Sequence, residues 1–195
     1  MNQPVDSRTG EYLRAMNIDL WVARDKVASA SAVTGKAAGE SNNARVQPIS
    51  SWSAAELPDR IVQLKVRSAG ELRQAELLVV TESPVPDAAC MKLMSSMFAA
   101  IKLDESQWLQ ASIVGDDTAV DLTRVIDSVK PKAVVLMADA HKKPDALDRL
   151  RGIRHQVSDL QPFFVVTFGP VDLLDNPDAK RPAWEDLKQL HQWLS

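Results

Sequence analysis

The sequence predicts an α/β domain with a mainly parallel central sheet between two layers of helices. Three short apolar runs, at 77–80, 132–137 and 163–168, are typical of strands that are covered on both faces. Segments with a helical spacing of apolar residues lie between and after these runs, at 88–103, 120–129, 146–150 and 182–194. This alternation of strands with helices favours a three-layer α/β/α arrangement around a parallel sheet.

Two further strands have weaker patterns. Residues 61–66 alternate apolar with polar side chains, which is typical of a half-buried or edge strand, and residues 108–114 indicate another strand. Ligands of parallel α/β sheets bind beyond the carboxyl ends of the strands. The candidate functional loops are therefore those that follow the strands, at 81–87, 115–118, 138–141 and 169–177.

The chain before the domain divides into two regions. We predict an amphipathic partner-binding segment over 1–24 and a flexible linker over 25–57, with the folded domain at 58–195. The linker is predicted from its abundance of Ala, Ser, Gly and Asn and its lack of apolar periodicity. The first segment places Leu13 and Met16 on one face of a short helix. Because so short a helix is marginal in water, these apolar side chains need a surface on the domain or on a partner.

Trp21 is the strongest argument that the N-terminal segment binds something. A large aromatic residue is out of place in a tail without a role, which is the alternative interpretation, and aromatic residues are enriched at interface anchor points. The predicted partner-binding residues are Tyr12, Leu13, Met16, Ile18, Trp21 and Arg24.

Composition excludes several classes of function. The net charge of −3 provides no basic excess for holding DNA directly. The single cysteine, Cys90, rules out an internal disulfide and a four-thiolate cluster, and its apolar neighbours indicate a buried thiol. His141, His155 and His191 show no metal-ligand spacing, so we expect no metal and no cofactor. The polar N-terminus and the lack of a long apolar run predict a cytoplasmic protein without membrane contact.

Motifs in the predicted domain resemble those of the uracil-DNA glycosylase superfamily, especially its family 4. Residues 80–84 (VTESP) stand where that family has GEAPG after a strand, and residues 129–138 match its LxPxxIxxLG pattern. A Leu-Arg-Gly turn follows at 150–152. Residues 167–177 then correspond to a strand with HPAYLLRNP, and 183–187 (AWEDL) to AWxDL. The resemblance implies a glycosylase-like fold.

The departures from that family fall where its chemistry is done. Gly169 stands at the position of the catalytic histidine, Asp175 replaces a basic residue, and the cluster cysteines are absent. Glu82 alone matches a functional position, that of the water-activating carboxylate. The resemblance therefore implies a degenerate site, in which Glu82 caps the following helix or lies exposed in a loop. The alternative is an active or divergent uracil-DNA glycosylase with Glu82 as general base.

A narrower resemblance covers both ends of the chain. Residues 13–24 (LRAMNIDLWVAR) are similar to the LxxLGIxxWxxR segment of the psi-subunit family of the bacterial DNA polymerase III holoenzyme, and residues 173–180 with Trp184 follow that family's C-terminal pattern. This resemblance implies a non-catalytic adaptor. Its N-terminal segment binds the clamp-loader (gamma/tau) subunits, its folded domain binds the chi subunit, and it reaches DNA only indirectly. A glycosylase-like domain with some other partner remains a further alternative.

Overall fold

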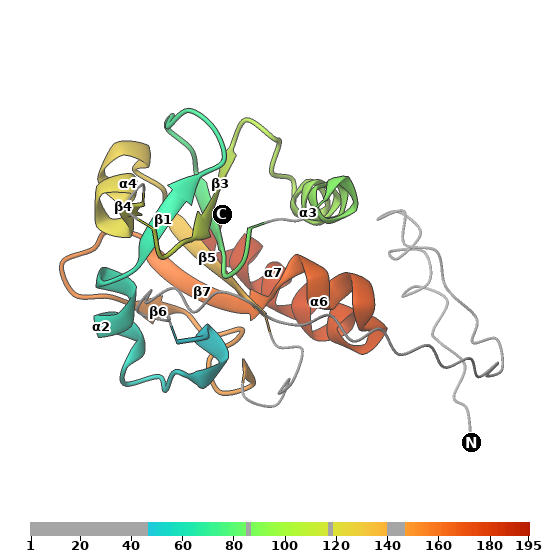
Figure 1. Ribbon diagram of the computed structural model, residues 1–195. Helices are drawn as coiled ribbons and strands as arrows, with labels where there is room; N and C mark the ends of the chain where they lie inside the picture. The colour runs from blue at the N-terminus through green and yellow to red at the C-terminus, as the bar shows by residue number, and fades with distance from the viewer. Residues whose placement is uncertain (1–46, 85–86, 117–118, 140–146) are drawn as a thin grey trace, which may run out of the picture. The chain divides into compact units, whose positions relative to one another are not determined.

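The computed structural model describes residues 47–84, 87–116, 119–139 and 147–195 (Figure 1). The chain divides into two compact units, residues 1–44 and 45–195, and the first lies outside the described residues. The predicted partner-binding segment at 1–24, and the predicted linker up to residue 46, therefore lie outside the part of the chain whose structure follows.

The described part is built on a mixed, curled sheet of seven strands in the order β4-β1-β3-β2-β5-β7-β6. Its centre is parallel: β2 pairs with β3 on one side and β5 on the other, and β5 pairs with β7. Antiparallel strands close both edges, with β4 and β1 beside β3 and β6 beside β7. The strands are β1 Lys65–Ser68, β2 Leu77–Thr81, β3 Trp108–Ile113, β4 Val120–Asp121, β5 Ala133–Ala138, β6 His155–Gln156 and β7 Phe163–Phe168. The predicted α/β class is confirmed.

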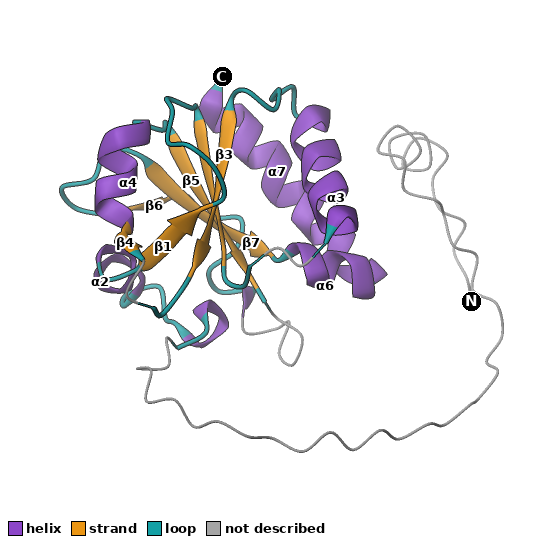
Figure 2. Cartoon of the chain, turned by 45° about the horizontal axis from the view of Figure 1, so that its top comes forward, coloured by secondary structure: helices purple, strands orange, loops and turns teal. Residues whose placement is uncertain are grey.

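Helices cover both faces of this sheet. Those described are α2 Leu57–Val62, α3 Ala88–Ala100, α4 Leu122–Val129, α6 Pro170–Asp175 and α7 Lys180–Leu194, with short 3-10 turns η1 Ile49–Ser51 and η2 Pro177–Ala179. Figure 2 shows α3, α6 and α7 on one side of the sheet and α2 and α4 on the other.

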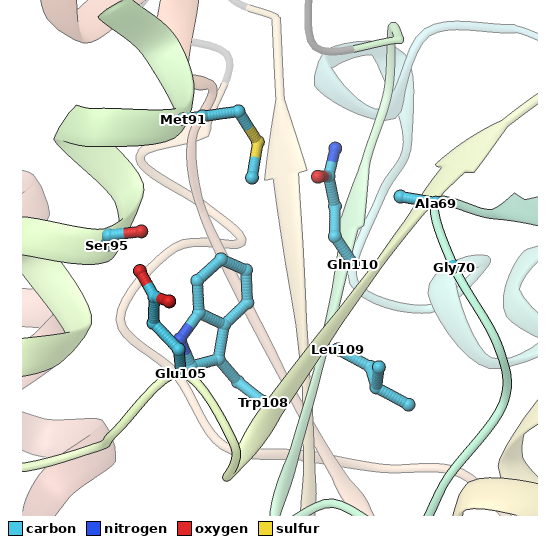
Figure 3. A pocket seen from close by; sticks show the side chains of 8 residues that line it. All are labelled: Ala69, Gly70, Met91, Ser95, Glu105, Trp108, Leu109 and Gln110. Carbon is cyan, nitrogen blue, oxygen red and sulfur yellow. The ribbon is translucent and has the colours of Figure 1, made fainter. Parts of the chain in front are cut away.

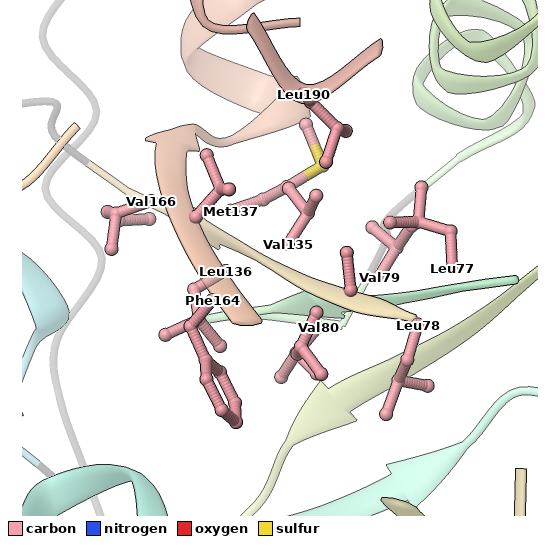
Figure 4. Close-up of a cluster of buried hydrophobic side chains, with 14 of the residues drawn as sticks. Leu77, Leu78, Val79, Val80, Val135, Leu136, Met137, Phe164, Val166 and Leu190 are labelled. Carbon is pink, nitrogen blue, oxygen red and sulfur yellow. The ribbon is translucent and has the colours of Figure 1, made fainter. Parts of the chain in front are cut away.

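The core follows from the alternation of side chains along the central strands. Val79 of β2 and Val135 of β5 are register partners and point toward Leu190 of α7, whereas Val80 and Leu136, the next pair, point to the opposite face (Figure 4). Every residue of β2, β5 and β7 is buried. A strand buried on both faces has no polar side to alternate with, which is why these three appear in the sequence as continuous apolar runs.

The predicted strand at 61–66 is wrong over 61–64 and holds only for its last two residues. Residues 57–62 form α2, and the strand begins later, at Lys65. Pro58 lies at the first turn of α2, where its missing N–H leaves no hydrogen bond unmade. Leu57 and Ile61 are both fully buried and lie one turn apart on the helix. A spacing of four residues places two side chains on one face of a helix and also on one face of a strand.

Two other boundaries differ from the prediction. The predicted helix at 120–129 is divided, because Val120–Asp121 pairs with β1 as β4 and the helix α4 begins only at Leu122. The loop predicted at 169–177 contains α6, which starts with Pro170 at its first position. The predicted helix at 146–150 lies partly outside the described residues, and residues 148–150 form a turn.

The folded part also begins before residue 58, the predicted domain boundary. Ile49 is fully buried and Trp52 is 5% exposed, so the last residues of the predicted linker belong to the core. We call residues 47–56 the strap. Its few apolar residues lie among Ser, Pro and Ala, and a composition-based boundary cannot separate them from the linker before them.

Candidate functional site

The site predicted by the topology lies between β2 and β5. From β2 the chain crosses to β3 on one side, and it later places β5 on the other side of β2. Such a reversal of direction is the point at which doubly wound sheets bind ligands, beyond the carboxyl ends of the strands. Glu82 follows β2, Asp139 follows β5 and Gly169 follows β7. The structure brings these three sequence-predicted positions together.

Glu82 is bound on both carboxylate oxygens by the backbone of its own chain. Its Oε1 accepts a hydrogen bond from the Ile49 N–H at 3.0 Å, and its Oε2 accepts one from the Asp139 N–H at 2.8 Å. The expected role as a helix cap is wrong, because Asp87 caps α3 by accepting from the Cys90 N–H at 2.8 Å. Nor is Glu82 an exposed loop residue, since it is half-buried. It fastens the strap to the edge of the sheet.

The environment of Glu82 makes its ionisation harder. Burial raises the pKa of this carboxyl above the usual value for glutamate, and the nearby carboxylates of Asp139 and Asp172 add to that shift. The two backbone N–H donors act against it, because they stabilise the charged form. Asp172, on α6, is itself only 5% exposed. Three acidic side chains, those of Glu82, Asp139 and Asp172, therefore lie near one another at the carboxyl edge of the sheet.

Gly169 has no room for a side chain. A Cβ atom added to Gly169 would lie 2.5 Å from Oδ1 of Asp139 and 3.1 Å from the Ala138 carbonyl oxygen. Ser83 donates its hydroxyl hydrogen to the other carboxylate oxygen of Asp139 and holds that side chain in place. The backbone of Gly169 is ordinary (φ −68°), so the restriction is one of space. The Asp139 carboxylate fills the position from which a side chain at 169 would start.

The strap closes the same edge. Ile49, which binds Glu82, lies in η1, and Trp52 directly follows this turn. The Trp52 indole N–H donates to the Gln47 carbonyl oxygen at 3.2 Å, which fixes the ring across the start of the strap. Sequence reasoning missed the strap as part of the site. Its hydrogen bond to Glu82 joins residues 33 positions apart, and no local pattern encodes such a contact.

A second polar cluster joins two of the sequence motifs. Asp186 of α7 is 2% exposed; its Oδ1 accepts from the Arg151 guanidinium at 3.1 Å and its Oδ2 from the Thr167 hydroxyl at 2.8 Å. Gly152 has a φ of 64°, and a Cβ there would lie 2.6 Å from Asp186 Oδ1. Burial raises the pKa of Asp186 to about 6, although its hydrogen bonds and the charge of Arg151 lower it. Thus 150–152 and 183–187 meet through one buried carboxylate.

The remaining candidates take structural positions or lie outside the described residues. Cys90 is buried as predicted, and its burial raises the pKa of the thiol to about 11, which favours the protonated form at neutral pH. A ring nitrogen of His155 lies 2.8 Å from the Leu150 carbonyl oxygen. Within the described ranges, no group of three His, Cys, Asp or Glu residues is arranged to hold a metal ion. The following predicted residues lie outside those ranges: Tyr12, Leu13, Met16, Ile18, Trp21, Arg24 and His141.

No helix among the described residues is both long and apolar enough to cross a membrane. No protein-family model matches the chain, and no curated protein is significantly similar to it in sequence. The residues and their contacts must therefore carry the functional argument alone.

Proposed function

We propose that the chain is a non-catalytic, protein-binding member of the uracil-DNA glycosylase-like α/β/α class, whose former active site has been closed by its own strap. More particularly, we propose that it is a psi-like adaptor subunit of the bacterial DNA polymerase III holoenzyme. It links the clamp loader, through residues 1–24, to the chi subunit, through the folded domain. The observation that carries the loss of catalysis is the engagement of both Glu82 oxygens by backbone N–H groups.

A general base must lie within hydrogen-bonding distance of the water that it activates. In this chain the Ile49 N–H holds one oxygen of Glu82 and the Asp139 N–H holds the other. The strap that supplies Ile49 lies against Glu82, the group that an extruded base would have to approach. Glu82 therefore has a structural role. It matches the position of a water-activating carboxylate in sequence but does not perform that function.

The second catalytic requirement fails at Gly169. Glycosidic cleavage leaves negative charge on the departing base, and a positioned donor or cation stabilises that charge. Here the position carries no side chain, and the nearest polar group is the Asp139 carboxylate. A carboxylate repels a developing anion, so this arrangement opposes the reaction.

The glycosylase-like fold is supported by contacts between the motifs that suggested it. The Leu-Arg-Gly turn and the AWEDL helix are far apart in sequence, yet Arg151 binds Asp186 and Gly152 leaves the space that Asp186 needs. The helices on both faces of the parallel strands agree with a three-layer arrangement (Figure 2). A shared buried contact gives these weak motifs a common physical reason to be present together.

Gly169→His is expected to leave the chain without uracil-excision activity, as is the unaltered chain. A histidine side chain at 169 would have to displace the Asp139 carboxylate. Glu82 would still be hydrogen-bonded to the strap through Ile49. The measurement is release of uracil from a single-stranded oligonucleotide, with protein purified from a host that lacks its own uracil-DNA glycosylase. Excision by the unaltered chain that disappears in Glu82→Gln would contradict the proposal and favour the active-glycosylase alternative.

Trp21→Ala is expected to weaken binding to purified clamp-loader subunits about tenfold or more, as loss of an aromatic anchor does. Titration calorimetry with the full-length chain measures this affinity. Val27→Ala, in the predicted linker, is the matched control and should change it less than about twofold. If the unaltered chain binds no clamp-loader subunit, the psi-like assignment is wrong. If Trp21→Ala binds as tightly as the unaltered chain, the N-terminal segment is not the anchor.

A further inference from the structure

Helix α3 has an unusual surface. Of its 13 residues, Lys92 is the only one that carries a charge. A surface helix normally carries several charged or polar side chains on the face that points away from the core. In the described part of the chain α3 is covered on one side only, and its exposed positions are Ala88, Ala89, Met91, Lys92, Ala99 and Ala100. The composition of α3 indicates that its outer face meets another apolar surface.

A groove of about 240 Å³ lies between α3 and β3, next to this face (Figure 3). Met91 and Ser95 of α3 line one side, and Trp108 and Gln110 of β3 lie across from them, with Glu105 near the indole (Figure 3). Tryptophan and methionine are enriched at protein–protein interfaces relative to the rest of the surface. Met91, which is 36% exposed, is one of the largest apolar side chains that α3 leaves open.

Trp108 provides an independent observation that points to a ligand. Its side chain is only 6% exposed, and its indole N–H, among the described residues, has no hydrogen-bond partner. A buried donor without an acceptor costs roughly 1–3 kcal/mol. Figure 3 shows the indole nitrogen on the edge of the ring that faces Glu105 and Ser95, at the border of the groove. The exposed Glu105 side chain can swing aside, so an acceptor entering from the groove reaches this N–H.

We propose that the groove and the exposed face of α3 form the surface through which the domain binds its protein partner. The partner contributes a helix that lays small or unbranched apolar residues on Met91 and the alanines of α3 and places one amide side chain beside Trp108. This inference rests on the proposed adaptor function and adds to it the binding face of the domain.

The charges of the groove select this occupant. An amide oxygen accepts from the Trp108 N–H while its NH₂ group donates to the Glu105 carboxylate, so one side chain satisfies both. A carboxylate in the same place would be repelled by Glu105, and a lysine or arginine offers no acceptor to the indole. Nucleic acid is disfavoured because no residue that lines the groove is a cation and the exposed face of α3 adds only Lys92 to neutralise phosphates.

The test compares two identical substitutions on different surfaces. Met91→Glu introduces a charge into the groove, and Ile153→Glu introduces the same charge at another exposed residue, before β6. The full-length chain and both variants are titrated with purified chi subunit, and circular dichroism confirms that both variants are folded. Met91→Glu is expected to raise the dissociation constant about tenfold or more, and Ile153→Glu to leave it within about twofold.

The indole N–H of Trp108 supplies a second readout. In ¹H–¹⁵N spectra its resonance, assigned by its loss in Trp108→Phe, is expected to move downfield when the chi subunit is added, since the N–H gains an acceptor. Equal binding of chi by the unaltered chain and Met91→Glu overturns the groove while leaving the adaptor function in place. No binding of chi by any of the three proteins removes both. A shift of the Trp108 resonance with single-stranded DNA instead of chi would make the groove a nucleic-acid site and overturn the proposal.

Discussion

Glu82→Ala is expected to lower the free energy of unfolding by about 3 kcal/mol, since it leaves two backbone N–H donors, those of Ile49 and Asp139, without their acceptor. The Ile49 donor lies in a fully buried residue, where water cannot easily replace the lost carboxylate. Glu82→Gln should have a smaller effect, because an amide oxygen can still accept one of the two bonds. Denaturant unfolding followed by circular dichroism measures both.

Glu71→Ala is the matched control for this prediction. Glu71 is exposed and should change the free energy of unfolding by less than about 0.5 kcal/mol. Limited proteolysis adds a local readout: in Glu82→Ala the strap loses its attachment to the sheet, so cleavage within 47–56 should become faster than cleavage elsewhere in the domain. Unfolding curves for Glu82→Ala and Glu71→Ala that coincide would show that Glu82 does not hold the strap, and the closed-site argument would lose its main support.

The parts of the fold that the sequence predicts are those in which burial leaves a continuous trace. Phe163–Phe168 was predicted with its observed bounds, because a parallel strand between two layers of helices has apolar side chains at every position. The prediction failed at 61–64, because Ile61 belongs to a helix that begins at Leu57, and a strand and a helix share this spacing of buried residues. A proline at the first turn decided in favour of the helix.

The candidate site divides in the same way. The placement of Glu82 and Gly169 at one edge of the sheet follows from topology, because the carboxyl ends of parallel strands share that edge. The topology does not predict that the strap lies at that edge. The Glu82 contacts join residues 33 and 57 positions apart and end on backbone N–H groups, which every residue type except proline provides.

Asp186→Ala is expected to lower the free energy of unfolding by about 3 kcal/mol at pH 7, because the substitution leaves the buried Thr167 hydroxyl without an acceptor and removes one of the two carboxylates that bind Arg151. Arg151 keeps its ion pair with Asp148, at 2.7 Å, which limits the loss. Glu185→Ala, on the same helix, is the control. Its carboxylate pairs with Lys188 at the surface, and such pairs contribute at most about 1 kcal/mol.

The cost of Asp186→Ala should also depend on pH, and the sign follows from the raised pKa. Burial raises the pKa of Asp186 to about 6 in the folded chain, whereas its ordinary value is 3.8. Between these values the folded chain holds a proton that the unfolded chain has released, so protonation stabilises the fold as the pH falls. The stabilisation is complete below pH 3.8 and is lost as the pH rises through 6. The alanine variant lacks this group, so its deficit relative to the unaltered chain should be larger at pH 4 than at pH 7.

Unfolding of both proteins at the two pH values distinguishes two physical accounts of this carboxylate. A deficit that grows toward acid means that the loss of water around Asp186 outweighs its attraction to Arg151. A deficit that shrinks toward acid means that the ion pair dominates and that the pKa lies below its ordinary value. In the first case the ionised carboxyl is less favourable than the protonated carboxyl in the folded chain, and its hydrogen bonds to Arg151 and Thr167 fix the position of α7 against β7.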